Sequence, residues 1–208
     1  MNRKIIIALV LLQVSFLAFA ENVKFITGKN SEIKEVGTEL YIGYGSKVSQ
    51  IEFENKNPEI KSITIEGAAF LKDLSFIKNC KKLEVLVMNN ISVKDTSFLY
   101  DLPNLKVVAF DSVEIKTLPN LLKIKNLEYI SLTNCDLTKY DGLTSHAKKL
   151  KFVNLAYNSI SELPAPKKAD KAIYFVTGNK ITTSDYSNYY FGSDYVSKLP
   201  QELAKFVR

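Results

Sequence analysis

The sequence is short of the side chains that metal sites and nucleophilic enzymes use most. It has one histidine, His146, and two cysteines among 208 residues. A zinc site needs three or four protein ligands, mostly His and Cys, and a nucleophilic Ser or Cys usually works with a His. No Gly-rich phosphate loop ending in Lys and Ser or Thr is present. We therefore expect no catalytic residues, no metal and no cofactor, although carboxylates such as Glu66 and Asp111 leave acid–base chemistry open.

Arginine is also scarce. Only two of the 28 basic residues are Arg, and the others are Lys. Arg makes the bidentate contacts typical of nucleic-acid recognition, so this bias argues against a nucleic-acid partner.

A long apolar run occurs only in the first 20 residues. Arg3 and Lys4 precede the largely apolar residues 5–19, and Ala18-Phe19-Ala20 offers small residues where a signal peptidase cuts. The run is short for a hydrocarbon core of about 30 Å. We expect residues 1–20 to be a signal peptide, and the mature protein to be secreted, periplasmic or on the cell surface without stable membrane insertion. The alternative is an uncleaved anchor.

An eleven-residue phrase, with apolar residues at positions 1, 4, 6 and 11, returns six times. The copies are 21 to 23 residues apart and begin at Ile60, Leu83, Leu105, Leu127, Leu150 and, in a weaker form, Lys171. A repeat of this length predicts a solenoid in which each copy forms one short strand at positions 3 to 7. Positions 4, 6 and 11 then point into a shared core, and positions 3 and 5 point outward.

The repeats divide the mature chain into three parts. Residues 60–181 hold the phrases, joined by return segments that we expect to contain 3₁₀ or single helical turns. Residues 21–59 read as an N-terminal cap with short strands at 23–26, 39–42 and 51–53. Residues 182–208 read as a C-terminal cap whose final helix has one apolar side: Leu199, Leu203, Phe206 and Val207.

The two cysteines are expected to stay reduced. Cys80 and Cys135 fall in coils two strand spacings apart, or about 10 Å. A disulfide needs Cα atoms within about 7 Å, so both should be buried thiols.

The phrase L-x-x-L-x-L-x-x-N-x-L makes the chain similar to leucine-rich repeat proteins. The spacing near 22 residues, with Asp73-Leu74-Ser75-Phe76-Ile77 and Asp95-Thr96-Ser97-Phe98-Leu99 ahead of the next strand, resembles bacterial internalin-like repeats. This resemblance implies an α/β solenoid with about six coils, a concave parallel sheet, export, and protein recognition, often of a host. Two features depart from it. Only Asn158 and Asn179 supply the position-9 asparagine, and the N-terminal cap reads as strands rather than helices.

The outward columns supply the candidate binding site. Five of the six residues at position 3 are apolar, where solvent favours polar ones. With positions 5 and 8 they form a stripe: Val85, Val87, Val107, Tyr129, Phe152, Tyr157, Ile173 and Phe175. We expect this stripe to bind a protein partner of host or envelope origin, or a second copy in a homodimer. Alternatively, the caps cover the stripe, or its side chains only stabilise one another laterally.

The charges follow the repeat as well. Position 2 alternates in sign over Lys61, Glu84, Lys106, Glu128 and Lys151, which predicts ion pairs between neighbouring strands. The return segments hold 13 Lys against 6 acidic residues. A basic convex side of this kind suits a second function, a scaffolding component of the cell envelope held on anionic surfaces, or simply keeps the protein soluble.

Overall fold

The computed structural model describes most of the repeat region and parts of both flanks. The described residues are 23–25, 33–53, 56, 58–93, 95–115, 120, 123–140, 149–163, 172–182 and 189–190. The predictions of a signal peptide at residues 1–20 and a final helix near the C-terminus lie outside these ranges, as does His146. Within them, no helix is long and apolar enough to cross a bilayer.

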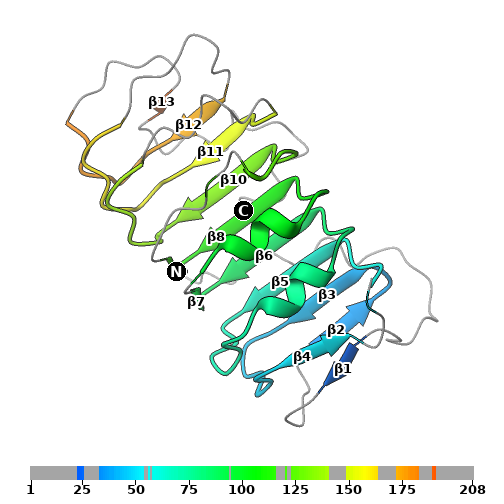
Figure 1. Cartoon of the computed structure of the whole chain (residues 1–208). Coiled ribbons are helices and arrows are strands. Elements are labelled where there is room, and N and C mark those ends of the chain that lie inside the picture. Colours follow the sequence, from blue (N-terminus) through cyan, green and yellow to red (C-terminus); the bar gives the residue numbers. More distant parts are fainter. Residues whose placement is uncertain are drawn as a thin grey trace.

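A nine-stranded sheet runs the length of the molecule (Figure 1), in the order β13-β12-β11-β10-β8-β6-β5-β3-β2. Its strands are β2 (Ile33–Val36), β3 (Glu39–Ile42), β5 (Ser62–Glu66), β6 (Val85–Asn89), β8 (Val107–Asp111), β10 (Tyr129–Thr133), β11 (Phe152–Asn154), β12 (Ile173–Phe175) and β13 (Tyr189–Tyr190). All neighbours pair in parallel except β2 with β3. Each repeat therefore adds one strand beside the previous one, which confirms the predicted solenoid.

The pairing register follows the phrase position by position. The six strands of the repeats all begin at position 3, and pairing places these residues in one row: Ser62, Val85, Val107, Tyr129, Phe152 and Ile173. Residues at the same position of successive repeats are therefore neighbours across the sheet. The twelve side chains at positions 4 and 6 are at most 1% exposed and belong to one core cluster. Because each coil leaves this column open at both ends, only stacking buries it.

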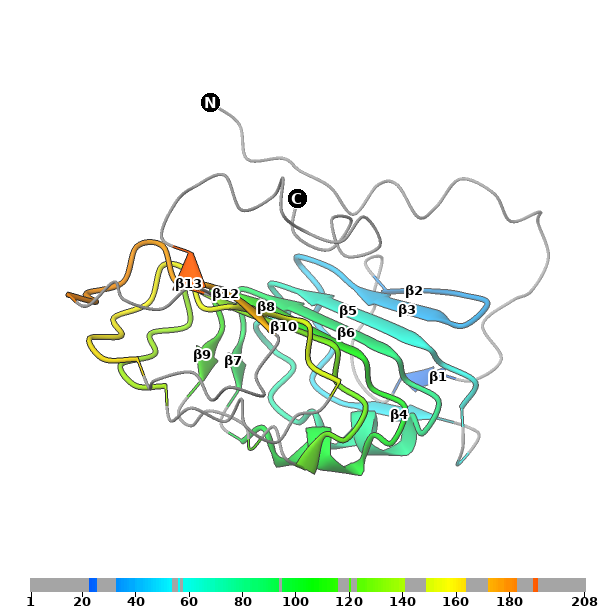
Figure 2. The same cartoon turned by 90° about the horizontal axis from the view of Figure 1, so that it is seen from above.

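The convex side contains the predicted 3₁₀ turns. Helices η1 (Ser75–Asn79) and η2 (Ser97–Asp101) lie below the sheet in Figure 2, and β7 (Ser92–Val93) pairs with β9 (Glu114–Ile115) in a small parallel sheet. An aspartate opens each helix: Asp73 and Asp95 each accept the N–H of the residue two positions later at 2.8 Å. The Ser75 N–H stabilises the ionised carboxylate of Asp73 and lowers its pKa. The Ser97 hydroxyl, which donates to Asp95, and then the Ser97 N–H lower the pKa of Asp95 in the same way.

The prediction that position 11 points inward is wrong in the first coil. Phe70 is 58% exposed, and Leu71 occupies the buried place instead. The chain turns tightly here, because Ala69 N–H donates to the Gly67 carbonyl and Leu71 N–H to the Ala68 carbonyl. The next two coils have β7 and β9 at this point, which keep position 11 inward.

The N-terminal region adds a strand to the repeat sheet. In β3, Leu40 and Ile42 pair opposite Ile63 and Ile65, and both are buried. The repeat phrase cannot be recognised in this segment of the sequence, because Gly37 occupies position 1, where the phrase has an apolar residue. Farther out, β1 (Val23–Phe25) pairs antiparallel with β4 (Ile51–Phe53). The strands predicted at residues 23–26, 39–42 and 51–53 correspond to β1, β3 and β4, whereas β2 was not predicted.

Both cysteines are free and fully buried, as predicted from their spacing. Burial penalises the thiolate and raises the pKa of Cys80 and of Cys135 to about 12. Both thiols therefore act as small apolar residues in the core.

Candidate binding face

A second apolar cluster lies on the face of the sheet opposite the core cluster. We call it the outer column, and its members are Val85, Val87, Val107, Ala109, Tyr129, Phe152, Ile173 and Phe175. They occupy positions 3 and 5 of five successive strands, where the alternation of a strand turns side chains away from the core. The structure thus brings together seven of the eight predicted partner-binding residues and adds Ala109.

Aromatic rings stack along the outer column. The Tyr129 and Phe152 ring centroids are 4.9 Å apart with planes 4° apart, so these two rings stack. The Phe152 and Phe175 centroids are 5.0 Å apart, with planes tilted by 38°. The separation matches the strand spacing of about 4.8 Å because parallel pairing in register places each ring directly beside the next. Such pairs contribute roughly 0.5–1.5 kcal/mol beyond area burial. These contacts stabilise the sheet laterally. Lateral stabilisation is one of the two alternatives to partner binding that the sequence left open.

Most of the outer column is not exposed. Tyr129, Phe152 and Phe175 are 0% exposed and Val107 is 6% exposed, whereas Val85, Val87 and Ile173 are half-buried. The expectation of an exposed stripe is thus wrong for its aromatic centre. The ring contacts place Phe152 between the other two rings, which repeat spacing alone does not reveal. Whether these residues contact a partner stays a prediction.

Two polar residues interrupt the column and are satisfied within the sheet. Ser131 Oγ lies 3.1 Å from Thr133 Oγ1, and Asn154 Nδ2 donates to the same hydroxyl at 3.2 Å. Asn154 Oδ1 also accepts the Ala156 N–H at 3.0 Å. Thr133 therefore joins β10 to β11, a role that the sequence pattern did not indicate.

The residue at position 8 has a left-handed backbone in every repeat. The φ angles lie between 52° and 73° for Gly67, Asn90, Ser112, Asn134, Tyr157 and Gly178. Glycine adopts this conformation freely and asparagine tolerates it, but other side chains pay roughly 1–2 kcal/mol. Ser112, with φ 55°, and Tyr157, with φ 57°, therefore bear this cost.

The Tyr157 ring lies against the next coil. A Cβ on Gly178 would come within 2.6 Å of Tyr157 Cδ1, so the ring occupies space that only glycine leaves open. The side chain nevertheless stays 54% exposed. Tyr44 shows the same arrangement on Gly67 at the other end of the sheet and is 55% exposed. Of the eight predicted binding residues, Tyr157 alone is exposed.

Asn158 fixes the turn that carries Tyr157. Its Oδ1 accepts the N–H groups of Cys135 at 2.9 Å and Leu137 at 3.1 Å. Its Nδ2 donates to the carbonyls of Leu132 at 2.7 Å and Leu155 at 2.8 Å. The position-9 asparagine therefore bonds the backbone of its own coil and of the preceding coil. In the preceding coil the Cys135 thiol lies 3.3 Å from the Thr133 carbonyl, where a side-chain amide would otherwise bond.

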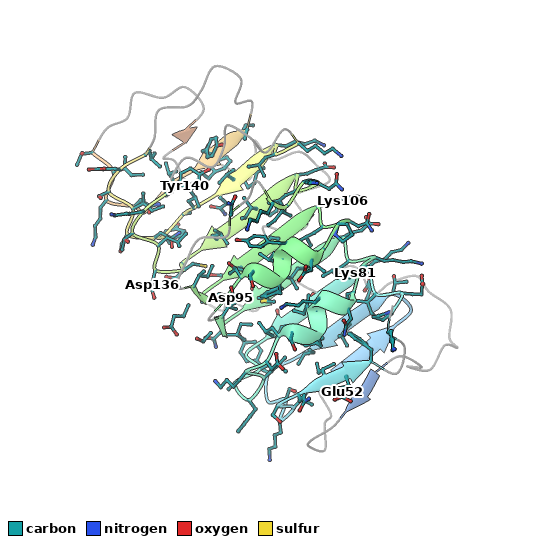
Figure 3. The ribbon with its side chains drawn as sticks, viewed as in Figure 1. Glu52, Lys81, Asp95, Lys106, Asp136 and Tyr140 are labelled. Carbon is teal, nitrogen blue, oxygen red and sulfur yellow. The ribbon has the colours of Figure 1, made fainter. Side chains whose placement is uncertain are left out.

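Charged groups near the sheet are engaged with one another. Lys106 Nζ lies 2.7 Å from Glu84 and Lys151 Nζ lies 2.7 Å from Glu128. These are two of the four neighbouring pairs that the alternation over Lys61, Glu84, Lys106, Glu128 and Lys151 predicts, so the ladder forms in part. The bond from Lys106 lowers the pKa of Glu84, and the same bond raises the pKa of Lys106. Figure 3 shows Lys106 where the strands begin and Asp136 on the opposite side, where the strands end.

Other carboxylates considered for chemistry also have partners. Glu66 accepts hydrogen bonds from the Tyr41 hydroxyl at 2.9 Å and from Asn89 Nδ2 at 3.0 Å. Among the residues that the structure describes, no three His, Cys, Asp or Glu side chains gather as metal ligands would. The absence of catalysis and of a cofactor remains a prediction.

No family model and no curated protein matches this chain. Solved structures do. Internalin C2 of Listeria monocytogenes is 23% identical, with a TM-score of 0.52 over 65% of this chain and 62% of that one. An internalin designated inlF from the same bacterium is 20% identical, with a TM-score of 0.52 over 71% of this chain and 49% of that one. Listeria monocytogenes InlP is 12% identical, with a TM-score of 0.51 over 62% and 39%.

The chain thus corresponds to between 39% and 62% of the length of these neighbours. Identities of this size establish likeness of fold. The parallel sheet, the 3₁₀ turns on its convex side and the solved neighbours agree that this chain has the leucine-rich repeat fold of internalins.

Proposed function

We propose that the protein is a non-enzymatic module that binds a protein partner through the outer face of its sheet, with Tyr157 as the anchor. The repeat sheet supplies a rigid surface, and the likeness to internalins favours protein recognition. Export and a partner in a host or in the cell envelope belong to the same proposal. They are supported by the sequence pattern of residues 1–20 and by the type of repeat.

Tyr157 carries the proposal because the fold gains little from it. Its left-handed backbone costs roughly 1–2 kcal/mol relative to glycine, and more than half of its side chain remains in solvent. Asn90 and Asn134 occupy the same position without that cost. Backbone strain that packing does not offset often marks a functional position, and tyrosine is enriched among interface anchors.

The half-buried members of the outer column extend the accessible surface. Val85, Val87 and Ile173 keep part of their side chains in solvent, unlike the stacked rings between them. A partner with an apolar or aromatic side chain suits this combination, because aromatic and aliphatic groups dominate the centres of protein interfaces. The buried rings of Tyr129, Phe152 and Phe175 then act as support.

Replacing Tyr157 with asparagine tests the role of the ring without harming the turn. Asparagine already adopts this backbone at positions 90 and 134, so Tyr157→Asn should leave the melting temperature unchanged or raise it. Immobilised protein would be exposed to host-cell extract and to envelope extract, and the captured proteins quantified. We expect recovery of the specific partner to fall by about tenfold or more, as for an interface hot spot.

Tyr44→Asn is the matched control. It removes a ring of similar exposure that also lies on a glycine, at the other end of the sheet. It should leave recovery unchanged. If Tyr157→Asn captures the same proteins in the same amounts as the unmodified chain, the proposed anchor is wrong.

A second function, envelope scaffolding, is favoured by the charge of the convex side. Four lysines on the segment before β6 are exposed: Lys72, Lys78, Lys81 and Lys82. Binding to anionic envelope surfaces through such lysines should weaken steeply as salt rises. Salt-sensitive envelope binding that survives Tyr157→Asn would support this function over the first.

A further inference from the structure

The edge of the sheet where the repeat strands end carries a row of exposed side chains. We call it the strand-end row, and its members are Ser112, Asn134 and Tyr157 at position 8, with Asp111 beside Ser112. All four residues are exposed. The three position-8 residues share one backbone conformation, with φ angles of 55°, 54° and 57°. Because that conformation recurs on neighbouring coils, their side chains leave the edge in the same direction.

Backbone hydrogen bonds hold the row at the spacing of the strands. Each position-8 N–H donates to the position-7 carbonyl of the next coil, from Ser112 at 3.0 Å, from Asn134 at 3.1 Å and from Tyr157 at 2.7 Å. Successive side chains are therefore about 4.8 Å apart. Side chains on one side of an extended polypeptide recur about every 6.6 Å, whereas one sugar unit of an extended glycan is about as long as one strand spacing. The row is thus in step with a glycan.

The polar groups of the row are arranged to meet hydroxyl groups. Asn134 Nδ2 donates to Ser112 Oγ at 3.0 Å, and Ser112 Oγ donates to Asp111 Oδ1 at 3.1 Å. This chain of bonds orients all three side chains. Asn134 Oδ1 and Asp111 Oδ2 lie outside it, and each is an acceptor on an exposed side chain. The neighbouring hydroxyls of a sugar can donate to such acceptors and accept from the amide.

Tyr157 supplies the apolar part of a sugar site. Part of its ring lies against Gly178, and the side chain is still 54% exposed. The C–H face of a pyranose packs on an aromatic ring, while the hydroxyls around the sugar reach polar neighbours. Tyr44 lies on Gly67 in the same way, but the turn after Gly67 exposes the apolar Phe70. Of these two rings, Tyr157 is the one that continues a row of polar side chains.

The charge of this edge favours an uncharged glycan. The chain has 28 basic residues, yet positions 7 and 8 of the coils that contain β6, β8, β10 and β11 hold one carboxylate and no cation. These residues are Asn89, Asn90, Asp111, Ser112, Thr133, Asn134, Ala156 and Tyr157. A sulfated or sialylated glycan finds no cation among them and is repelled by Asp111.

From these observations we propose that the strand-end row binds a neutral glycan over about three sugar units. One unit packs on Tyr157, the next bonds to Asn134, and the third bonds to Ser112 and Asp111. The site spans two strand spacings, or about 10 Å. The inference rests on the proposed function in that the protein partner carries this glycan. The polypeptide of the partner then meets the half-buried members of the outer column.

Oxidation with periodate tests whether the partner is recognised through a glycan. Mild periodate cleaves sugars between neighbouring hydroxyl-bearing carbons and leaves the polypeptide chain intact. Host-cell extract and envelope extract would be oxidised or mock-treated and then passed over the immobilised protein. We expect oxidation to lower recovery of the partner about tenfold, as Tyr157→Asn does. Undiminished recovery of a partner that still requires Tyr157 would overturn the glycan and leave the proposed function standing.

Asn134→Gly tests the polar part of the site. Glycine adopts the left-handed backbone freely, so the variant loses the amide and keeps the turn. We expect its binding to the partner to fall about fivefold or more, because sugar hydroxyls lose their bonds to the amide. Asn90→Gly is the matched control. It makes the same change at the same position, with φ 52°, beyond the chain of bonds that ends at Asp111. It should alter binding by less than about twofold.

An array of immobilised neutral, sialylated and sulfated oligosaccharides separates this inference from the proposed function. We expect retention on neutral members, weakened by Tyr157→Asn and Asn134→Gly and unaffected by Tyr44→Asn. That result supports the glycan site even if no protein is captured from either extract. Three results would overturn the site. They are no retention on any neutral member, an equal response to Asn134→Gly and Asn90→Gly, and retention confined to sulfated members and abolished by salt, which would indicate the lysines of the convex side.

Discussion

At position 8 the backbone restricts which residue the chain can use. Six successive repeats adopt a positive φ there, and five of them use Gly, Asn or Ser. The preference for glycine and asparagine at this position is visible in the sequence. At Gly178 the ring of Tyr157, which lies one coil away, adds a second reason for glycine to the positive φ. A contact of that kind depends on the stacking of coils and leaves no local signal.

Replacing Gly178 with alanine should show what the ring contact adds to the backbone requirement. Both Gly178 and Gly37 have a positive φ, but a Cβ meets the Tyr157 ring at the first and nothing within 4 Å at the second. We expect Gly37→Ala to cost about 1 kcal/mol of unfolding free energy in urea, from strain alone, and Gly178→Ala to cost at least about 1 kcal/mol more. Equal costs would mean that the ring moves aside freely.

At the scale of strands, alternation and repeat spacing predict much of what is observed. They place the six repeat strands, the buried columns and the parallel register correctly, because each depends on the two-residue period of a strand. Two features escape that reasoning. Phe70 turns outward because a tight turn replaces a strand in its coil. The rings of the outer column are buried because burial depends on what packs over a face, which is a non-local property.

The outer column should behave as a structural element when its rings are removed. Phe152 is 0% exposed, stacks on Tyr129 and contacts Phe175 with its ring plane tilted by 38°. We expect Phe152→Ala to cost about 3–5 kcal/mol, and Tyr129→Ala added to it to cost less than it does alone, since the stacking is already lost. Urea denaturation of the two single variants and the double variant measures this coupling. Additive costs would contradict the stacking account.

The ion pairs between strands should contribute little and in a defined pH range. Because Lys106 lowers the pKa of Glu84, the folded state holds this proton more weakly than the unfolded state does. The resulting stability is present above the unfolded pKa and is lost as the pH falls through the folded pKa. The pair is partly exposed, so Glu84→Gln should cost less than about 1 kcal/mol at neutral pH. Denaturation of variant and parent should converge in acid and in high salt, and a persistent difference would point to packing instead.

For the molecule as a whole, the repeats provide a fold and a rigid face but do not identify a partner. The sequence predicts the solenoid because every coil repeats one pattern, and it predicts which residues share the outer face because the register is regular. It does not distinguish accessible from covered residues on that face. The structure separates them, leaving Tyr157 exposed at 54% and the stacked rings enclosed.

The affinity of the captured partner for the intact protein and for Tyr157→Asn is the most direct test of the proposed function. Calorimetric titration of both, with Tyr44→Asn beside them, would separate an anchor from a merely exposed ring. We expect Tyr157→Asn to bind about tenfold or more weakly at an unchanged or higher melting temperature, and Tyr44→Asn to bind normally. Equal affinity of all three proteins would contradict the assignment of Tyr157 as the anchor.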